Sequence, residues 1–407
     1  MSSPYPRVLL VNAQPISRRY ANGIAMGNLF RGWPIDRIAQ IYCDDSAPDE
    51  TVCSRSWRLE VEDAPMPGWL QRWVRRGSKT AYARYVTYAR FSVPQEVSSG
   101  VTAFRPDVIY SSLEVRRITG LALDLARRLS VPLIPHFMDD WLTGPVSPPR
   151  GPLAKMAQRD LEHKALRALH DAPVNLVIGE YMADAYERRY GRRFVPFMNC
   201  VDLDERPVIS TVRRDDGVFR FGFTGRLLFS RDDALVDVVD ALGALHGEGV
   251  RTELVVYQHD PGEELPEHIV RSPVVRLADL REEALLETAD CEIDAFLHVD
   301  TFEERARRYL QFSLSGKVPW YLAAGVPLFA YGAPEPGTMR FLRDQKCAAV
   351  VDRRDSELLR RRLRDLVRDD GVRRDLGARA RLVAQEYFDA RVKREAFRRV
   401  LSEACTR

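Results

Sequence analysis

Short apolar segments alternate with amphipathic segments along most of this chain, and that alternation constrains the fold more than any other feature. Pro106–Ser111 and Val131–Pro135 are short, apolar and bounded by turn residues, which predicts two buried strands. Between them, Arg116–Ser130 carries leucines at helical spacing. A strand, a helix and a second strand in this order form a βαβ unit with a parallel strand pair.

The alternation breaks once and then restarts, which predicts two domains. The break, Asp204–Gly217, is charged, and Phe219–Gly225 begins a new series of strands and helices. We therefore expect an α/β protein of two Rossmann-like domains, each with a doubly wound sheet. Such sheets bind ligands outside the carboxyl ends of their strands, so two domains that face each other would enclose a deep cleft. The predicted parts are an N-terminal domain at 1–204, a C-terminal domain at 205–388 and a C-terminal helix at 389–407 that can cross back to the first domain.

The charge and cysteine content exclude several classes of protein. Charged residues make up 29% of the 407 residues, but the net charge is only +3, which argues against a dedicated nucleic-acid binder. The six cysteines are scattered without a Cys-x-x-Cys pair, as expected of thiols in a reducing compartment. The apolar segment near the N-terminus is too short for a signal peptide, and no uncharged run approaches a membrane span in length. We expect a cytoplasmic protein that can touch the inner face of a membrane.

A glycine and two arginines follow the first strand of the second domain, in the segment FGFTGRLLFSRD. Gly225 would let the backbone turn closely, and Arg226 and Arg231 would point into the cleft. A bound pyrophosphate needs such a glycine for access and guanidinium groups to pair with. A tight turn with two solvated arginines explains the same residues equally well.

The segment SLSGKVPWYLAAGVP places a lysine between a polar turn and a short apolar helix. Ser315 and Gly316 are expected to cap the helix Val318–Ala324. Lys317 is unfavourable at the positive end of a helix dipole unless an anion shares the site. Lys317 is therefore a candidate ligand for a diphosphate, and a lysine that extends into solvent is the alternative.

Together these segments resemble a known family. FTGRL and the pattern K-x-x-x-Y-L-A-A-G-x-P before a strand look like motifs of retaining, family-4-type GT-B glycosyltransferases of capsule and exopolysaccharide biosynthesis. Asn22–Asp45 and PHFMDDW at Pro135–Trp141 are similar to polysaccharide-synthesis members of that group, so the resemblance spans nearly the whole chain. It implies two Rossmann-like domains facing an inter-domain cleft, with the acceptor bound by the first and a nucleotide-sugar by the second. The implied reaction moves a hexose-type sugar from a nucleoside diphosphate sugar to a hydroxyl of a glycan or lipid-linked saccharide, with retention.

The resemblance also assigns roles to residues. The family's G-R-L-x-x-x-K pattern falls on Gly225 and Arg226, with Arg231 in place of the lysine. Such cations would neutralise the departing diphosphate, so no metal or other cofactor is expected. The predicted catalytic residues are Arg226, Lys317 and His136, and the predicted donor-binding residues are Gly225, Arg231, Ser315, Gly316, Trp320, Tyr321 and Gly23.

One departure from the family concerns two glutamates that have seven residues between them. In the family the first contacts the transferred sugar and the second binds the donor ribose. Here these positions are Phe312 and Trp320, which can fill neither role. Trp320 can stack on a base or a sugar, or it can pack in the core.

The first domain offers candidate acceptor ligands at two predicted strand ends. Asn22 and Gly23 follow the first strand, where the family often places glycines near the donor diphosphate, although a flexible loop is the simpler explanation. His136, Asp139 and Asp140 follow Val131–Pro135 and could orient the acceptor hydroxyl or remove its proton. A structural histidine and an aspartate that caps a helix are the alternatives. The predicted acceptor-binding residues are Asn22, Asp139 and Asp140.

A basic and aromatic segment, Pro67–Phe91, is a candidate membrane-contact helix. It combines tryptophan and tyrosine with arginine and lysine, as helices on anionic bilayers do, and lipid-linked acceptors lie at such surfaces. A half-buried helix with a solvated basic face explains the same composition.

Three other functions remain open. A nucleotide-sugar epimerase of the same fold would depend on carboxylates and histidines in the cleft, which Phe312 and Trp320 do not favour. A catalytically silent, sugar-nucleotide-binding scaffold subunit would explain the missing glutamates. A nicotinamide oxidoreductase is disfavoured because no G-x-G-x-x-G follows a first strand. Release of free nucleoside diphosphate would separate enzyme from scaffold, and an epimerised nucleotide-sugar would indicate the epimerase.

Overall fold

The computed structural model of the chain describes residues 5–17, 21–59, 72, 93–143, 152–205, 216–257, 265–279 and 292–406. The chain forms two compact units, Met1–Asn199 with Val392–Arg407, and Cys200–Arg391. Apart from Arg72, the candidate membrane helix Pro67–Phe91 lies outside the described residues, as does most of the predicted break between the domains. Among the described helices, none is both long enough and apolar enough to cross a membrane.

The first unit contains a parallel sheet whose described strands follow the order β3-β2-β1-β4-β5-β6-β7. β4 and β5 pair in parallel, and α5 connects them, which confirms the predicted βαβ unit. β1 is buried along its whole length, as expected of a strand covered on both faces. The strands are β1 Val8–Val11, β2 Ile38–Tyr42, β3 Arg55–Arg58, β4 Val108–Ser111, β5 Leu133–Phe137, β6 Asn175–Val177 and β7 Phe194–Pro196.

The helices of this unit bury one apolar side each. In α5 the buried side includes Ile118, Leu121 and Leu125, while Arg127 and Arg128 at its end are exposed. The last helix, α16, completes the core of this unit through Phe397, which is fully buried. The helices are α1 Ala21–Phe30, the 3-10 turn η1 Ile35–Arg37, α4 Gln95–Phe104, α5 Arg116–Leu129, α6 Pro152–Asp171, α7 Glu180–Tyr190 and α16 Ala390–Ala404.

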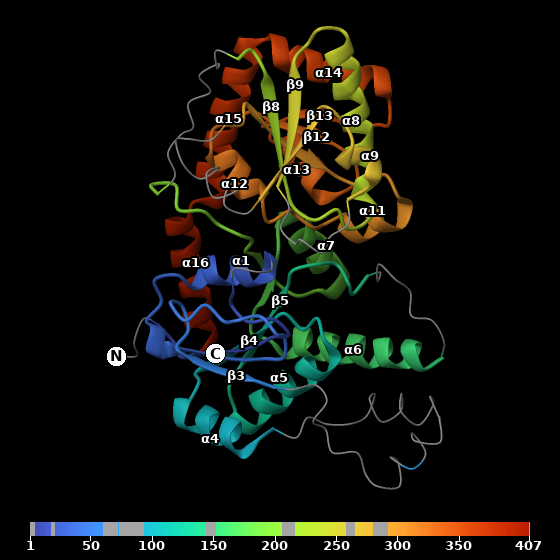
Figure 1. Cartoon of the computed structure of the whole chain (residues 1–407). Helices are drawn as coiled ribbons and strands as arrows, with labels where there is room; N and C mark the ends of the chain where they lie inside the picture. The colour runs from blue at the N-terminus through green and yellow to red at the C-terminus, as the bar shows by residue number, and fades with distance from the viewer. Residues whose placement is uncertain are drawn as a thin grey trace. The chain divides into compact units, whose positions relative to one another are not determined.

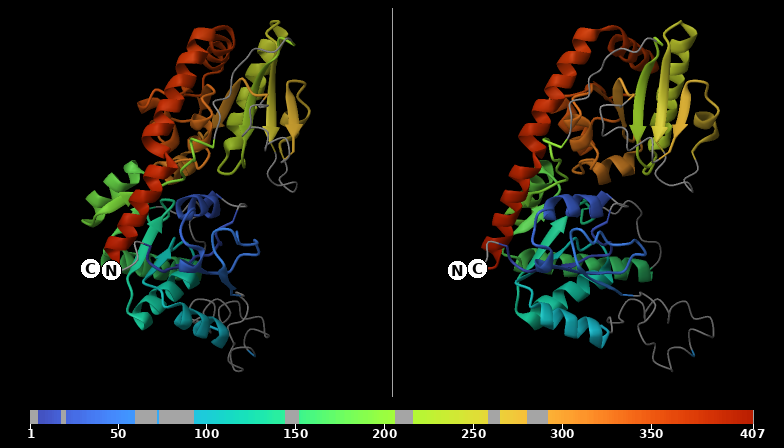
Figure 2. Two further views of the ribbon diagram at one scale, coloured as in Figure 1. Left: turned by 90° about the vertical axis from the view of Figure 1, so that its left-hand side faces the viewer. Right: turned by 60° about the vertical axis from the view of Figure 1, so that its left-hand side comes forward.

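The second unit contains a parallel sheet with the described order β10-β9-β8-β11-β12-β13. The side views show β8 and β9 running in the same direction (Figure 2). Its strands are β8 Phe219–Thr224, β9 Thr252–Tyr257, β10 Val275–Ala278, β11 Ala295–Val299, β12 Leu328–Tyr331 and β13 Ala349–Val351. Its helices are α8 Arg231–Gly247, α9 Glu267–Val270, α11 Glu304–Leu310, α12 Val318–Ala323, α13 Gly337–Asp344, α14 Ser356–Arg368 and α15 Asp370–Phe388.

Helices cover both faces of the second sheet. α8 packs with α14, and α12 packs with α15, and the two pairs lie on opposite faces (Figure 1). Between the layers, Phe221 of β8 and Phe329 of β12 are fully buried, with ring centroids 6.4 Å apart. Each unit is thus a doubly wound α/β domain, which confirms the predicted class.

Each sheet has one switch point, where the strand order reverses. In the first unit it lies between β1 and β4, and in the second between β8 and β11. Ligands of doubly wound sheets bind at the carboxyl ends of the strands beside this point. The residues to consider first are those that follow Val11, Ser111, Thr224 and Val299.

Candidate active site

The turn after β8 is built around Gly225. β8 ends at Thr224, whose carbonyl oxygen accepts a hydrogen bond from Lys317 Nζ at 2.6 Å. Gly225 has a φ of 124°, and a β-carbon here would lie 1.5 Å from Lys317 Nζ. Glycine is therefore required by the backbone and by the lysine that lies against it. The structure brings these two candidate diphosphate ligands together at the switch point of the second unit.

Tyr321 fastens α12 to the same strand end. Its hydroxyl oxygen lies 3.2 Å from the backbone nitrogen of Thr224 and accepts a hydrogen bond from it. Its ring stacks on Phe296 of β11, with the centroids 4.7 Å apart. α12 follows Lys317 directly, so these contacts also hold the lysine at Gly225.

The start of α12 differs from the sequence-based expectation. Ser315 and Gly316 do not cap the helix, because Lys317 occupies the N-cap position and no side chain caps it. The Ser315 carbonyl accepts from the Val318 N–H at 3.0 Å, and the Ser315 N–H donates to Thr338 Oγ1 at 2.9 Å. Since α12 has only six residues, its dipole does not make an anion site, and the useful charge is that of Lys317 itself.

Of the two predicted arginines, Arg226 lies on the segment that joins β8 to α8, and Arg231 is the first residue of α8. Arg226 is exposed, and Arg231 begins α8 with its Nε 3.2 Å from Asp300 Oδ1. Burial opposes ionisation of Asp300, but Arg231, His298 and the N–H of Thr301 outweigh it and hold the pKa of Asp300 at about 2. Sequence reasoning missed Asp300, although its place directly after a predicted strand was a signal for it.

The two positions that carry glutamates in the resembled family hold half-buried aromatic side chains. The ring of Trp320 lies 5.2 Å from the ring of Phe296, so part of it packs on β11. Phe312 is half-buried as well. Neither side chain offers the carboxylate that would bind a ribose or a sugar hydroxyl.

At the switch point of the first unit, Asn22 meets a carboxyl group that the sequence analysis missed. Asn22, on α1, donates through Nδ2 to Glu114 Oε1 at 2.9 Å. Glu114 follows β4, and burial together with the charge of Asp139 raises its pKa to about 8. Two of the three predicted acceptor ligands, Asn22 and Asp139, therefore interact with Glu114. The signal for it was its position three residues after the end of a predicted strand.

Gly23 is explained by packing within the unit. A β-carbon at this position would lie 2.8 Å from the Pro15 carbonyl oxygen and 2.9 Å from Ser17 Oγ. Gly23 is itself buried, so its close neighbour is the chain's own loop after β1. These contacts supply no approach to a diphosphate.

His136 and Asp140 lie in the core and bond to protein groups. His136 Nδ1 is 2.6 Å from the Tyr110 hydroxyl, and Nε2 is 2.8 Å from the Phe197 carbonyl oxygen. Burial lowers the pKa of His136 to about 4. Asp140 is fully buried and accepts a hydrogen bond from the Tyr186 hydroxyl at 2.8 Å. Both side chains thus stabilise the carboxyl end of β5. Asp139, in contrast, acts on Glu114, whose pKa its charge helps to raise.

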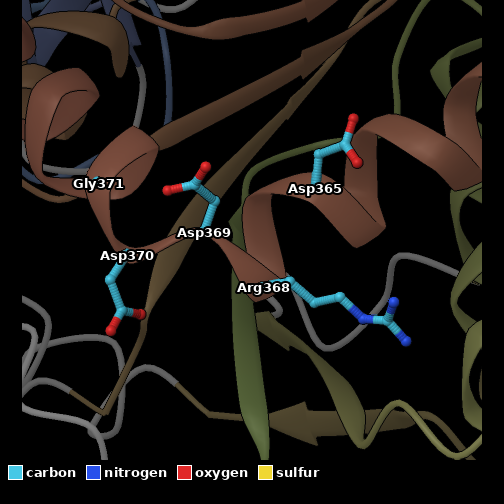
Figure 3. Close-up of a pocket in the computed structure, with 5 residues that line it drawn as sticks. All are labelled: Asp365, Arg368, Asp369, Asp370 and Gly371. Atoms are coloured by element: carbon cyan, nitrogen blue, oxygen red, sulfur yellow. The ribbon is translucent and has the colours of Figure 1, made fainter.

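A pocket of about 620 Å³ lies in the second unit, at the junction of α14 and α15, and none of the predicted site residues lines it. Its side chains fan out in different directions and do not converge on one point (Figure 3). Asp369 caps α15 by accepting from the Val372 N–H at 3.0 Å. Among the described residues, no group of three or more His, Cys, Asp or Glu side chains is arranged to hold a metal ion. The pocket is lined by Asp365, Arg368, Asp369, Asp370 and Gly371.

Comparisons with known proteins identify the fold. No model of a known protein family matches the sequence, and no curated protein matches it. Among solved structures, HepE from Anabaena, solved in complex with UDP and glucose, is 16% identical with a TM-score of 0.67, over 98% of this chain and 100% of that one. Sucrose-phosphate synthase from Thermosynechococcus elongatus is 13% identical with a TM-score of 0.66, over 97% and 98% of the two chains.

A third structure extends the comparison. WaaG, a glycosyltransferase involved in lipopolysaccharide biosynthesis, is 14% identical with a TM-score of 0.57, over 96% of this chain and 98% of that one. At these identities the likeness concerns the fold, which is shared over nearly the whole length. The chain therefore has the GT-B fold of these structures, with two Rossmann-like domains.

Proposed function

We propose that this protein is a glycosyltransferase that moves a hexose-type sugar from a nucleoside diphosphate sugar to a hydroxyl group of a glycan or lipid-linked saccharide. The observation that carries the proposal is Lys317 Nζ held against Gly225 at the switch point of the second unit. Arg226 and Arg231 flank the same turn. Three cations at one strand end fit a ligand with several negative charges.

In the proposed reaction these cations act on the leaving group. The bond between the anomeric carbon and the diphosphate breaks with its electron pair on the diphosphate, which gains negative charge. The acceptor oxygen forms the new bond to the anomeric carbon, and its proton passes to the departing diphosphate. Fixed positive groups stabilise that charge more in the transition state than in the bound donor. Gly225 leaves room for Lys317 at the end of β8, since a side chain there would displace the lysine that contacts the diphosphate in this proposal.

The finer parts of the proposal come from the resemblance and the structural neighbours. HepE was solved with UDP and glucose, which makes UDP-glucose the first donor to test. Retention is tested by NMR of the product's anomeric carbon. We also propose that no metal is needed, because three cations can neutralise the diphosphate, and activity in a chelator tests this. A cytoplasmic role in polysaccharide biosynthesis, with peripheral contact to an anionic membrane, is tested with vesicles of anionic lipid.

Binding of UDP is the experiment that tests the site. Wild-type protein should bind UDP more tightly than UMP, measured by titration calorimetry. Lys317→Ala and Arg226→Ala should each weaken UDP binding by about tenfold to a hundredfold, because a hydrogen bond to a charged group contributes about 1.5–3 kcal/mol.

Arg362→Ala is the matched control. It removes one positive charge from an exposed side chain of the same unit, on α14. It should leave UDP binding unchanged. Equal affinities of wild type, Lys317→Ala and Arg226→Ala for UDP would rule out the proposed site, and UDP binding without any UDP release from UDP-glucose would indicate a silent subunit.

A further inference from the structure

A row of three charged or polar side chains, two of them buried and one partly exposed, lies at the switch point of the second unit, next to the turn after β8. It consists of His298 on β11, Asp300 at the end of that strand and Arg231 at the start of α8. We propose that Asp300 is a positioning residue, which orients Arg231 for contact with the donor diphosphate. This inference rests on the proposed function and adds a residue that does not itself touch the donor.

Asp300 holds Arg231 from the protein interior. Its Oδ1 accepts from Arg231 Nε at 3.2 Å and from the Thr301 N–H at 2.9 Å. Only 1% of the Asp300 side chain is exposed, against 18% for Arg231. The Asp300 carboxylate therefore lies in the interior of the protein, and the Arg231 guanidinium is the group that solvent and ligands can reach.

The space around Asp300 is matched to its side chain. A β-carbon on Gly332 of the neighbouring strand segment would lie 2.8 Å from Asp300 Cβ. His298 Nε2 lies 3.5 Å from Asp300 Oδ2, and neither atom has a hydrogen-bond partner among the described residues. A distance of 3.5 Å is long for a hydrogen bond, so His298 limits the space available to the Asp300 side chain without forming a hydrogen bond to it.

Arg231 is restrained on a second side as well. Its Cζ lies 5.8 Å from the ring centroid of Phe229, a distance at which a guanidinium is attracted to an aromatic face. Within the described part of the chain, its terminal nitrogens make no further hydrogen bond. Nε is thus occupied, while the terminal nitrogens remain for a ligand.

This arrangement reduces the entropy lost when the donor binds. A free arginine side chain loses rotamer entropy when a ligand orders it, and the ligand must offset that loss. Asp300 and Phe229 order Arg231 before the ligand arrives. Asp300 also brings a negative charge near the diphosphate, which opposes binding, so the two effects predict opposite results when that charge is removed.

The test is a double-mutant cycle with UDP as the probe. Asp300→Asn should weaken UDP binding about tenfold in the wild-type background, and should change it little in the Arg231→Ala background. Asp300→Glu should restore part of the loss, because it returns the charge. Tighter UDP binding by Asp300→Asn, or an equal loss in both backgrounds, would overturn the positioning role.

Asp237→Asn is the matched control in the same unit. Asp237 also pairs with an arginine, at 2.8 and 2.9 Å from Arg354, so its loss reports the general effect of breaking such a pair. It should lower the melting temperature without changing UDP affinity. If wild-type protein does not bind UDP at all, the proposed function fails and this inference fails with it, whereas binding with an uncoupled cycle rejects the inference alone.

Discussion

At the scale of single residues, the carboxyl group of Glu114 should make the stability of the protein depend on pH. Its pKa of about 8 exceeds the ordinary value because burial and then Asp139 disfavour the charged form. Between pH 4.5 and 8 the folded protein holds a proton that the unfolded chain releases. The stabilisation is therefore complete below pH 4.5 and is lost as the pH rises through 8.

Replacing Glu114 by glutamine should remove this loss of stability as the pH rises. Glutamine resembles the protonated acid and can still accept the Asn22 hydrogen bond. Because Glu114 is only half-buried, we expect the wild type to lose about 2 kcal/mol relative to Glu114→Gln between pH 5 and pH 8.5. Urea denaturation at a series of pH values measures this, and parallel curves for the two proteins would contradict it.

His136 should make the free energy of unfolding depend on pH in the acidic range. Burial holds its pKa at about 4, below the value of about 6.5 in an unfolded chain. The unfolded state binds the proton first, so stability is complete above pH 6.5 and falls by about 3 kcal/mol as the pH drops to 4. His136→Gln should be less stable at pH 7 but should show a shallower acid slope in urea denaturation.

At the scale of elements, the turn from β8 to α8 is the segment on which donor binding depends. Gly225→Ala would place a methyl group at the position of Lys317 Nζ and would strain the backbone. We expect UDP affinity to fall by about tenfold or more, as for loss of a charged hydrogen bond. Calorimetry with UDP measures this effect.

Gly243→Ala provides the comparison within the same unit. Gly243 lies inside α8, and a β-carbon there meets nothing within 4 Å. The alanine should stabilise the protein by about 0.5–1 kcal/mol, because glycine is a poor helix former. UDP affinity should not change. Equal UDP affinities of the Gly225→Ala and Gly243→Ala variants would show that the turn does not bind the donor.

Sequence patterns predicted the elements better than the contacts among side chains. The strand and helix order follows from the spacing of apolar residues, and the turn glycine at Gly225 follows from its place after β8. Glu114 and Asp300 could not be assigned in the same way, because burial raises the pKa of Glu114 and Arg231 of another element lowers the pKa of Asp300, and neither effect can be read from the spacing of residues along the chain. His136 was predicted to be catalytic from its position after a strand, and no sequence pattern indicated that both of its ring nitrogens bond to protein groups, the Tyr110 hydroxyl and the Phe197 carbonyl.

At the scale of the whole molecule, the chain leaves the first unit and returns to it. α16 contributes Phe397 to the first core, where its ring lies 5.0 Å from Phe30, 5.2 Å from Phe197 and 6.2 Å from Tyr110. The first unit therefore needs the last residues of the chain to complete its core. The candidate donor site lies entirely in the second unit, so damage to the first core should leave it intact.

Phe397→Ala tests this separation. Truncating a buried phenylalanine costs about 3–5 kcal/mol, which should lower the melting temperature of the first unit by about 10 °C. UDP should raise only the transition of the second unit, because a ligand stabilises the part that binds it. Phe388→Ala is the counterpart, since Phe388 is buried in the second unit. Calorimetric scans of both variants with and without UDP should show each substitution shifting its own transition, and a single transition shifted equally by both would mean that the two units unfold as one body.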